Sequence, residues 1–492
     1  MKQFTAGAML LLGWTLLIAR LDRPSLWVDE FLTLQMIAPN VFDTIATTTR
    51  DLHPPLYFIA LQGWLAFAGQ SDFTARWFSI ACGIVSVALL TVLSRQLVGA
   101  KSAMLAVLLL SVNPAFIMFS RMARYYALLM MLGLLSTVVL LKAIQRGGWK
   151  TWLAYTATAL AILSTFYPGG VLLVAHGVCF IARDVRRGLL RRWFSALAVA
   201  ALTFAPWFVV VARNQVAGAV AGAGADLSRS ALGWVLGVGA AFYTFSVGET
   251  LFPWNPFAWL ALAAIAILFV RALSTRARAV WQCFGLALLS LAFMSAVTTF
   301  VSVNTPFLNV AVRSLFVLPY WILVLAMGLT RFVSARAQFA LGGTVILVSG
   351  ISLFNYHAAR EFLNPIYFTP SRDAANLVLD QAIATDLVVS DYDSVFGHYF
   401  LPGGSPAQHL YSNQLDKIRS ALPARVWLIT IGRDRSQSSS TADQVRALLA
   451  VNYRLNRVEK MLPIDPTYKH FKDLILRRET YAQRLTIELY QR

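Results

Sequence analysis

The stretch Trp27-Val28-Asp29-Glu30 lies just outside the first long apolar run, residues 4–20, and is followed by His53-Pro54-Pro55-Leu56-Tyr57. A carboxylate beside hydrocarbon is costly unless it takes up a proton, lines a polar cavity or does chemistry. The two adjacent acids are therefore a candidate functional site. A helix that begins after Ser25 would also place both acids favourably in its first turn, and the residues leave this alternative open.

The composition is that of a membrane protein. Of the 492 residues, 58% are hydrophobic and 13% are charged, which excludes an ordinary soluble domain. A span needs about 20 apolar residues, and the apolar runs predict a polytopic α-helical protein with about eleven transmembrane helices. The predicted spans are residues 4–20, 77–94, 102–120, 125–143, 152–165, 170–182, 193–211, 257–270, 280–300, 313–330 and 338–354.

The charges in the loops predict the orientation. Basic residues occupy one set of loops: Lys2; Arg95 and Lys101; Lys142, Arg146 and Lys150; Arg183, Arg186, Arg187, Arg191 and Arg192; Arg271, Arg276 and Arg278; Arg331 and Arg336. By the positive-inside rule these loops and the N-terminus are cytoplasmic. Before residue 355, every acidic residue except Asp184 falls on the other side.

Two apolar segments, residues 54–68 and 233–247, do not fit this alternation as spans. A crossing at either one would invert the side of every later loop. The first is also short for a span, and Pro54-Pro55 suits the start of a helix better than its interior. We predict that both segments are re-entrant or interfacial helices.

After about residue 355 acids become frequent and the pattern changes. Short β-branched runs at 386–390 and 426–430 alternate with helix-like stretches at 371–384 and 440–451. The sequence therefore predicts two domains. Residues 1–354 form the transmembrane domain, with a first external loop at 21–76, and residues 355–492 form an extracytoplasmic soluble α/β domain.

The net charge of +19 does not indicate nucleic-acid binding. Much of the excess lies in the short cytoplasmic loops, where membrane orientation and anionic lipid headgroups account for it. Membrane lipids are therefore the expected partners of these residues.

A second polar motif, Ser120-Arg121-Met122-Ala123-Arg124-Tyr125-Tyr126, follows the 102–120 run at the same membrane level as Asp29. Guanidinium groups at such a place suit phosphate binding. The alternative is that they reach toward lipid headgroups, as arginines at helix ends often do. For Arg124 we favour phosphate binding, and for Arg121 the headgroup alternative.

The order of these motifs resembles that in the polytopic GT-C glycosyltransferases. The motifs are the apolar run, Trp-x-Asp-Glu, His-Pro-Pro-Leu-Tyr, the turn at residues 69–76 and Ser-x-x-x-Arg-x-Tyr. The similarity is to the bacterial branch related to protein O-mannosyltransferases and aminoarabinose transferases (glycosyltransferase family 39). It covers about residues 1–215 and is looser through Asn304-Thr305-Pro306 and Arg313. The resemblance implies sugar transfer from a polyprenyl-phosphate carrier to an extracytoplasmic acceptor in the bacterial cytoplasmic membrane, usually with inversion.

Carried over by position, Asp29 is implied to be the general base on the acceptor hydroxyl, with Glu30 beside it to position acceptor or base. Donor phosphate binding is assigned to Arg124, Arg313, His53 and Arg121. For Arg313 an interfacial anchor, and for His53 a structural capping role, are alternatives. Tyr125, Tyr126, Tyr57 and Tyr167 are candidates for sugar or lipid contact, although aromatic belts at membrane interfaces explain such residues without a ligand.

Two positions depart from the family pattern. Relatives often carry an acid at the position of Met122 and a histidine at that of Phe166. The first departure removes a candidate metal ligand and favours a metal-independent mechanism without a cofactor, with a divalent metal still open. The second leaves the acceptor side of the cavity open.

Other classes of function are also compatible with the chain. A transporter or flippase of lipid-linked saccharides needs the same spans and interfacial arginines, but would show internal symmetry and broken helices near the midplane. A sensor with a ligand-binding external domain would not depend on Asp29. For a transferase, glycolipid, polysaccharide and protein acceptors, and any sugar, fit the residues. We expect the external domain to help select the acceptor.

Overall fold

The computed structural model describes residues 2–49, 53–181, 187–220, 231–301, 310–332, 334–360, 362–364, 367–391, 395–404, 407–432, 440–461 and 484–492. The Asn304-Thr305-Pro306 motif lies outside these residues. The chain divides into two compact units. The first contains residues 1–21 and 33–354, and the second contains residues 22–32 and 355–492. The boundary near 354 agrees in position with the change in composition, but the short segment 22–32 is grouped with the C-terminal residues.

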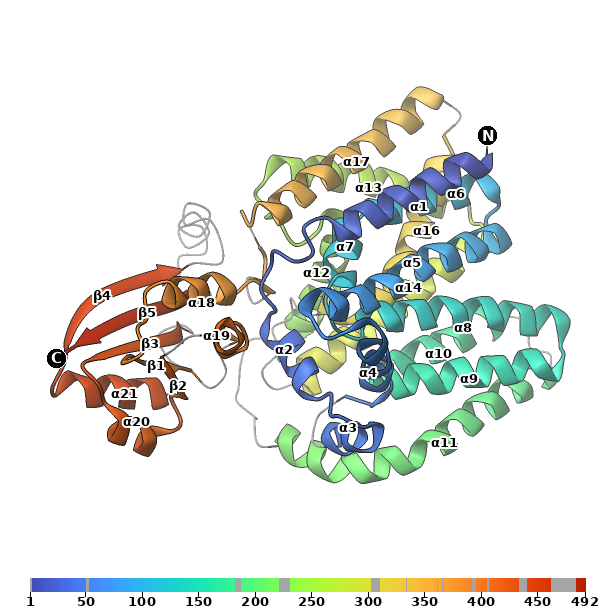
Figure 1. The fold of residues 1–492 in the computed structure, drawn as a ribbon. Coiled ribbons are helices and arrows are strands. Elements are labelled where there is room, and N and C mark those ends of the chain that lie inside the picture. The colour runs from blue at the N-terminus through green and yellow to red at the C-terminus, as the bar shows by residue number, and fades with distance from the viewer. Residues whose placement is uncertain are drawn as a thin grey trace. The chain divides into compact units, whose positions relative to one another are not determined.

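The first unit is helical (Figure 1). Its α-helices are α1 (Lys2–Ile18), α3 (Val41–Thr48), α4 (Leu56–Ala68), α5 (Asp72–Leu97), α6 (Ala100–Ser111), α7 (Pro114–Ser120), α8 (Tyr126–Arg146), α9 (Trp149–Thr165), α10 (Val171–His176), α11 (Arg187–Val220), α12 (Ala231–Val247), α13 (Pro256–Ser274), α14 (Arg278–Ala296), α15 (Val310–Arg313), α16 (Leu318–Thr330) and α17 (Ala335–His357). Shorter 3-10 or π turns are η1 (Tyr167–Gly170), η2 (Gly177–Ile181), η4 (Val297–Val301) and η6 (Leu315–Val317). Helix α2 (Val28–Gln35) begins in the second unit and ends in the first.

All of the predicted spans fall on helices. Within the described residues, six helices are long and apolar enough to cross a membrane: α5, α8, α11, α13, α14 with η4, and α17. The other predicted spans fall on shorter or bent helices, so the count of about eleven stays a prediction. Apolar side chains on the outside, such as Leu202 (73% exposed) and Phe339 (83% exposed), are placed to face lipid. The chain is a multi-pass membrane protein.

The predicted span at 102–120 consists of two helices that are together apolar and long enough for a span. α6 ends at Ser111, α7 begins at Pro114, and the pair is bent by 58°. Pro114 lacks the N–H that a continuous helix needs. The Asn113 side chain accepts a hydrogen bond from the Phe116 N–H (3.0 Å) and starts the new helix. The same side chain donates to the Phe245 carbonyl of α12 (2.9 Å).

The two segments predicted not to cross are short helices. α4 has 13 residues and begins directly after Pro55, as the double proline indicates. α12 has 17 residues. Their placement relative to the bilayer stays a prediction.

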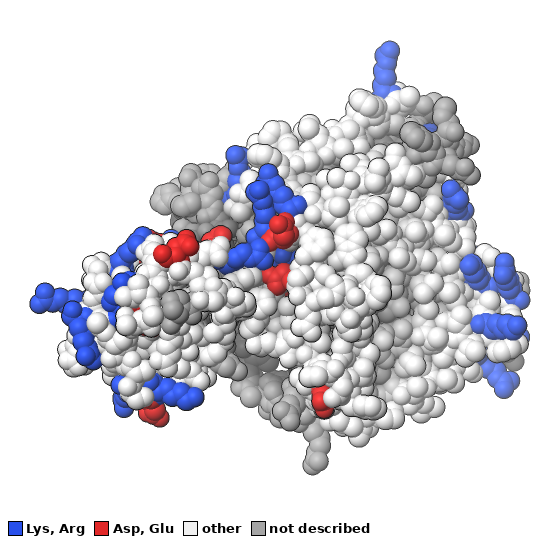
Figure 2. Space-filling view, viewed as in Figure 1, with Lys and Arg blue, Asp and Glu red and all other residues white. Residues whose placement is uncertain are grey.

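One end of the first unit is basic. Arg146 ends α8, Lys150 lies in the first turn of α9, and both are exposed. Arg192 of α11 donates to the Gly147 carbonyl between them (3.0 Å). Figure 2 shows lysine and arginine gathered where α8 and α9 meet, beside a broad uncharged surface. This end is the one that the positive-inside rule predicts to be cytoplasmic.

The second unit contains a five-stranded sheet in the order β2-β1-β3-β5-β4. The strands are β1 (Leu387–Ser390), β2 (Gln408–Tyr411), β3 (Arg425–Gly432), β4 (Arg454–Met461) and β5 (Arg484–Gln491), and the helices are α18 (Ser371–Leu379), α19 (Phe396–Phe400), α20 (Leu415–Ala421) and α21 (Ser440–Ala450), with a 3-10 turn η8 (Leu401–Gly403). β1 pairs in parallel with β2 and β3, whereas β5 is antiparallel to both β3 and β4.

Alternate residues of β3 explain why helices cover both faces of this sheet. Trp427 and Ile429 pack in one apolar cluster with α18 and α19. Val426 and Leu428 pack in another cluster with α20 and α21. Successive strand side chains point to opposite faces, so an almost continuous apolar strand is buried on both sides.

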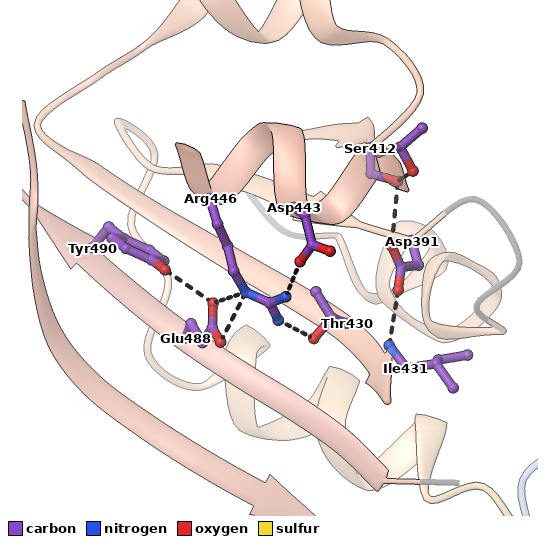
Figure 3. A network of polar contacts seen from close by, with 9 residues as sticks. Asp391, Ser412, Thr430, Ile431, Asp443, Arg446, Glu488 and Tyr490 are labelled. Atoms are coloured by element: carbon purple, nitrogen blue, oxygen red, sulfur yellow. Dashed lines mark hydrogen bonds and ion pairs between the residues drawn. The ribbon is translucent and has the colours of Figure 1, made fainter. Parts of the chain in front are cut away.

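A polar network ties α21 to the sheet (Figure 3). Arg446 pairs with Glu488 of β5 (Nε to Oε2, 3.1 Å) and donates to Thr430 of β3 (2.9 Å). The Tyr490 hydroxyl donates to Glu488 (3.0 Å). Burial, together with the Glu488 carboxylate, raises the pKa of Tyr490 to about 12. Nearby, the Asp391 carboxylate accepts hydrogen bonds from the Ile431 N–H (2.9 Å) and, less closely, from the Ser412 hydroxyl (3.3 Å).

Candidate functional site

The turn between α7 and α8 carries two buried arginines. Arg124 is 5% exposed and Arg121 is 2% exposed. The helices on either side of this turn are buried as well: all of Pro114–Ser120 and the first residues of α8. A guanidinium group stays charged at any physiological pH, so its burial requires partners.

Arg124 has partners from two other segments. Its Nη1 donates to the Thr33 hydroxyl of α2 (2.8 Å), and its Nη2 lies 3.3 Å from His53 Nε2. Its Cζ lies 5.6 Å from the centroid of the Tyr125 ring. The side chain is therefore fixed by hydrogen bonds at both terminal nitrogens.

The backbone of Arg124 is held as well. The Ser79 hydroxyl of α5 donates to the Arg124 carbonyl (3.2 Å). The Tyr57 hydroxyl of α4 is 3.1 Å from the same Ser79 oxygen. The structure thus places Tyr57 in a buried chain of hydroxyl groups that supports the turn.

The contact with Arg124 also determines the hydrogen positions of His53. A guanidinium nitrogen can only donate, so Nε2 of His53 accepts and the proton of the neutral ring is on Nδ1. The ring packs beside two aromatic neighbours: its centroid is 5.3 Å from that of Tyr125 and 6.4 Å from that of Phe166. Tyr125 and Phe166 stack on each other at 4.6 Å. We call Thr33, His53, Arg124, Tyr125 and Phe166 the Arg124 cluster.

The two acids lie in the first turn of α2. Glu30 is buried, and its carboxylate accepts a hydrogen bond from the Trp27 N–H (3.2 Å). This contact, three residues back to the helix start, is one half of a capping box, so Glu30 has a structural role at least. Asp29 is partly exposed. It precedes Thr33 by four residues, which is about one turn of the same helix.

Tyr167 is placed differently from Phe166. Phe166 has an extended backbone between α9 and η1, so consecutive side chains point to opposite sides. The Tyr167 hydroxyl accepts a hydrogen bond from Trp207 Nε1 of α11 (3.0 Å), and its ring packs on Phe204 and Phe208. Tyr167 thus faces α11, whereas Phe166 joins the Arg124 cluster.

The remaining predicted residues lie near helix ends. Tyr126 packs edge-on against Tyr125 at 4.7 Å. Arg121 directly follows α7. Arg313 is the half-buried last residue of α15. Their roles, like those of Asp29 and Glu30, stay predictions.

The sequence alone assigns no functional role to two members of the Arg124 cluster, Thr33 and Phe166. Thr33 is recognisable afterwards as the residue one helical turn beyond Asp29. Phe166 differs from the family pattern, and its packing on His53 depends on how α9 meets the loop before α4.

That no metal is required stays a prediction. Within the described residues no three histidine, cysteine or acidic side chains lie together.

Residues 52–210 match the family model described as dolichyl-phosphate-mannose-protein mannosyltransferase. This range includes His53, Arg124 and Phe166 but not Asp29. This match covers less than half of the chain. Together with the solved structures described next, it supports a GT-C, protein-mannosyltransferase-like fold. The predicted fold class is confirmed.

Solved structures extend the similarity in fold to the whole chain. ArnT from Cupriavidus metallidurans in the apo state has a TM-score of 0.57 and 13% identity, with 98% of this chain and 97% of that chain covered. ArnT from the same organism bound to undecaprenyl phosphate has a TM-score of 0.55 and 12% identity, with the same coverage. Comparison with curated protein sequences gives no significant match.

Proposed function

We propose that this chain is a membrane glycosyltransferase that moves a sugar from a polyprenyl-phosphate donor to a hydroxyl acceptor on the extracytoplasmic side. Asp29 is the general base and Arg124 binds the donor phosphate. The observation that carries the proposal is the Arg124 cluster, in which a buried guanidinium is held by hydrogen bonds to Thr33 and His53.

In the proposed reaction the acceptor oxygen attacks the anomeric carbon of the donor sugar. As the new carbon–oxygen bond forms, the bond from the anomeric carbon to the phosphate oxygen breaks, and its electron pair leaves with the polyprenyl phosphate. The acceptor proton passes to the Asp29 carboxylate. A positioned base of this kind contributes about 10²- to 10⁴-fold to the rate, and attack opposite to the leaving phosphate inverts the anomeric centre.

Arg124 suits the leaving-group side of this reaction. Negative charge grows on the phosphate as the bond breaks, and a cation already in place stabilises that charge without reorganisation. The contacts with Thr33 and His53 fix the guanidinium before the donor arrives. Because His53 accepts through Nε2, its Nδ1–H is the proton that it would offer as a donor.

The carrier class is supported by the fold and by the surface. A structure with the same fold, ArnT from Cupriavidus metallidurans, was solved bound to undecaprenyl phosphate. The exposed apolar side chains on α11 and α17 suit the surroundings of an isoprenoid tail. We place the basic end at α8 and α9 in the cytoplasm and the Arg124 turn, at the other end of α8, on the extracytoplasmic side of a bacterial inner membrane.

The test uses the purified full chain with radiolabelled polyprenyl-phosphate sugars and a membrane extract as acceptor. We expect label to become covalently attached to a component of the extract and free polyprenyl phosphate to be released in equal amount. Movement of intact donor across a vesicle membrane without release would instead indicate a transporter. Folded protein that releases no carrier from any donor would contradict the proposal.

A further inference from the structure

The segment that carries Asp29 and Glu30 packs with the C-terminal residues of the chain. Asp22–Leu32 and Asn355–Arg492 form one compact unit. The contacts described below join residues 340 or more positions apart in the sequence. They lie just before α2 and in its first turn, next to Asp29.

Hydrogen bonds hold the segment at three successive points. The Leu26 N–H donates to the Tyr399 hydroxyl oxygen of α19 (2.7 Å). The Arg372 N–H, in the first turn of α18, donates to the Ser25 hydroxyl (3.0 Å). The Arg372 guanidinium donates to the Asp22 carbonyl.

Ring contacts continue along the same segment. Trp27 meets Tyr367 edge-on at 5.1 Å, and Phe31 meets His398 at 5.7 Å. Leu26 is fully buried and Trp27 is 4% exposed. The Leu26 N–H has therefore left water, and loss of its acceptor is costly.

On the C-terminal side, Arg372 and Tyr399, which both contact the segment, also contact each other. The Arg372 Cζ lies 4.8 Å from the centroid of the Tyr399 ring, a cation–π distance. The Tyr399 ring in turn meets His398 edge-on at 5.0 Å. The groups that contact Asp22, Leu26 and Phe31 thus also pack on one another.

We infer that the C-terminal domain positions Asp29 for the reaction, with Tyr399 and Arg372 as positioning residues. Trp27 is the residue before α2 and donates to Glu30 inside the first turn, so anchoring of Leu26 and Trp27 sets the start and the direction of the helix. Asp29 follows two residues later. This role rests on the proposed function and is distinct from acceptor selection, which stays an expectation for the domain.

The expected effect is on the chemical step. A base displaced by about 1 Å loses up to about 10²-fold in rate, because the reacting atoms no longer meet in line. Removal of one buried hydrogen-bond acceptor leaves the segment held by its other contacts. For Tyr399→Phe we therefore expect kcat to fall about tenfold, with KM for the donor unchanged.

The experiment compares Tyr399→Phe with Tyr453→Phe in the full chain. Tyr453 is a control in the same unit, because its hydroxyl also makes a hydrogen bond to the backbone, here as the donor to the Pro423 carbonyl. Tyr399→Phe keeps the ring that packs on Arg372 and His398. Two readouts are taken: kcat and KM for carrier release, and hydrogen exchange of the peptide covering residues 22–32.

We expect faster exchange of residues 22–32 and a lower kcat in Tyr399→Phe alone, and a further loss of kcat when Ser25→Ala is added. Equal effects of the two tyrosine substitutions, unchanged exchange of residues 22–32, or a higher KM at constant kcat would overturn the inference. If the wild-type chain releases no carrier, the proposed function has failed, and hydrogen exchange still decides whether the domain holds this segment.

Discussion

Replacement of Arg124 by lysine tests the assignment of the phosphate-binding residue. Lysine keeps the positive charge but is a compact group without the planar fork of a guanidinium. It cannot reproduce both the 2.8 Å contact with Thr33 and the 3.3 Å contact with His53 in their present geometry. Charge therefore remains near the site, while its fixed position is lost.

The structure indicates the size of the effect. A hydrogen bond from a charged group contributes about 1.5–3 kcal/mol, and loss of one preorganised donor to a developing anion lowers kcat by about 10²- to 10³-fold. We expect Arg124→Lys to fall about 10²-fold in kcat, because some stabilisation by charge is retained. Arg124→Ala is expected to lose more.

The assay measures carrier release at saturating donor, with Arg76→Lys as the control. Arg76 is 5% exposed, like Arg124, and donates to the Leu21 carbonyl (3.0 Å), an acceptor that an ammonium group also suits. We expect this control to keep kcat within about threefold of wild type. Full activity in Arg124→Lys, or an equal loss in both variants, would refute the assignment.

Further predictions concern capping and the second unit. Glu30→Gln still accepts from Trp27 and should keep its melting temperature, whereas Glu30→Ala should lose about 1 kcal/mol of unfolding free energy; equal melting temperatures would argue against the cap. Burial lowers the pKa of His409 from 6.5 to about 4, so the stability that its neutral ring contributes should be fully present above pH 6.5 and fall by up to about 3 kcal/mol as the pH falls to 4. Thermal unfolding across this range should show a smaller slope for His409→Gln, and an unchanged slope would contradict the assignment. Arg446→Met leaves Glu488 without its cation and should destabilise the sheet by about 1–3 kcal/mol, seen as faster hydrogen exchange in β3 and β5.

The long apolar runs allowed much of the helical fold to be predicted, because burial and lipid contact both select them. The β1 and β3 strands were predictable for the same reason: their residues are apolar on both faces. β4 was missed because it reads Arg-Leu-Asn-Arg-Val-Glu-Lys-Met and is largely exposed at the sheet edge. The bend at Asn113-Pro114 does not show in the hydropathy of the run. Its local signal is Pro114, because a proline interrupts a continuous helix.

The site was less predictable. The sequence indicated Arg124 as a cation at a helix end suited to phosphate, and His53 as a residue of the family pattern, but neither the burial of Arg124 nor its contact with His53. Phe166 and Tyr167 are chemically similar neighbours, and only the extended backbone at Phe166 decides which one faces the Arg124 cluster. The contact between Leu26 and Tyr399 joins residues 373 positions apart, and no local pattern specifies such a pairing.

The measurement that tests the central claim most directly compares Asp29→Asn with Asp43→Asn in the carrier-release assay. Both aspartates lie in the first turn of a helix, so favourable interaction with the helix dipole alone would give the two substitutions similar, small effects. We predict that Asp29→Asn lowers kcat by about 10²- to 10⁴-fold and that Asp43→Asn leaves it near the wild-type value. Full transfer by folded Asp29→Asn protein would contradict the assignment of Asp29 as the base.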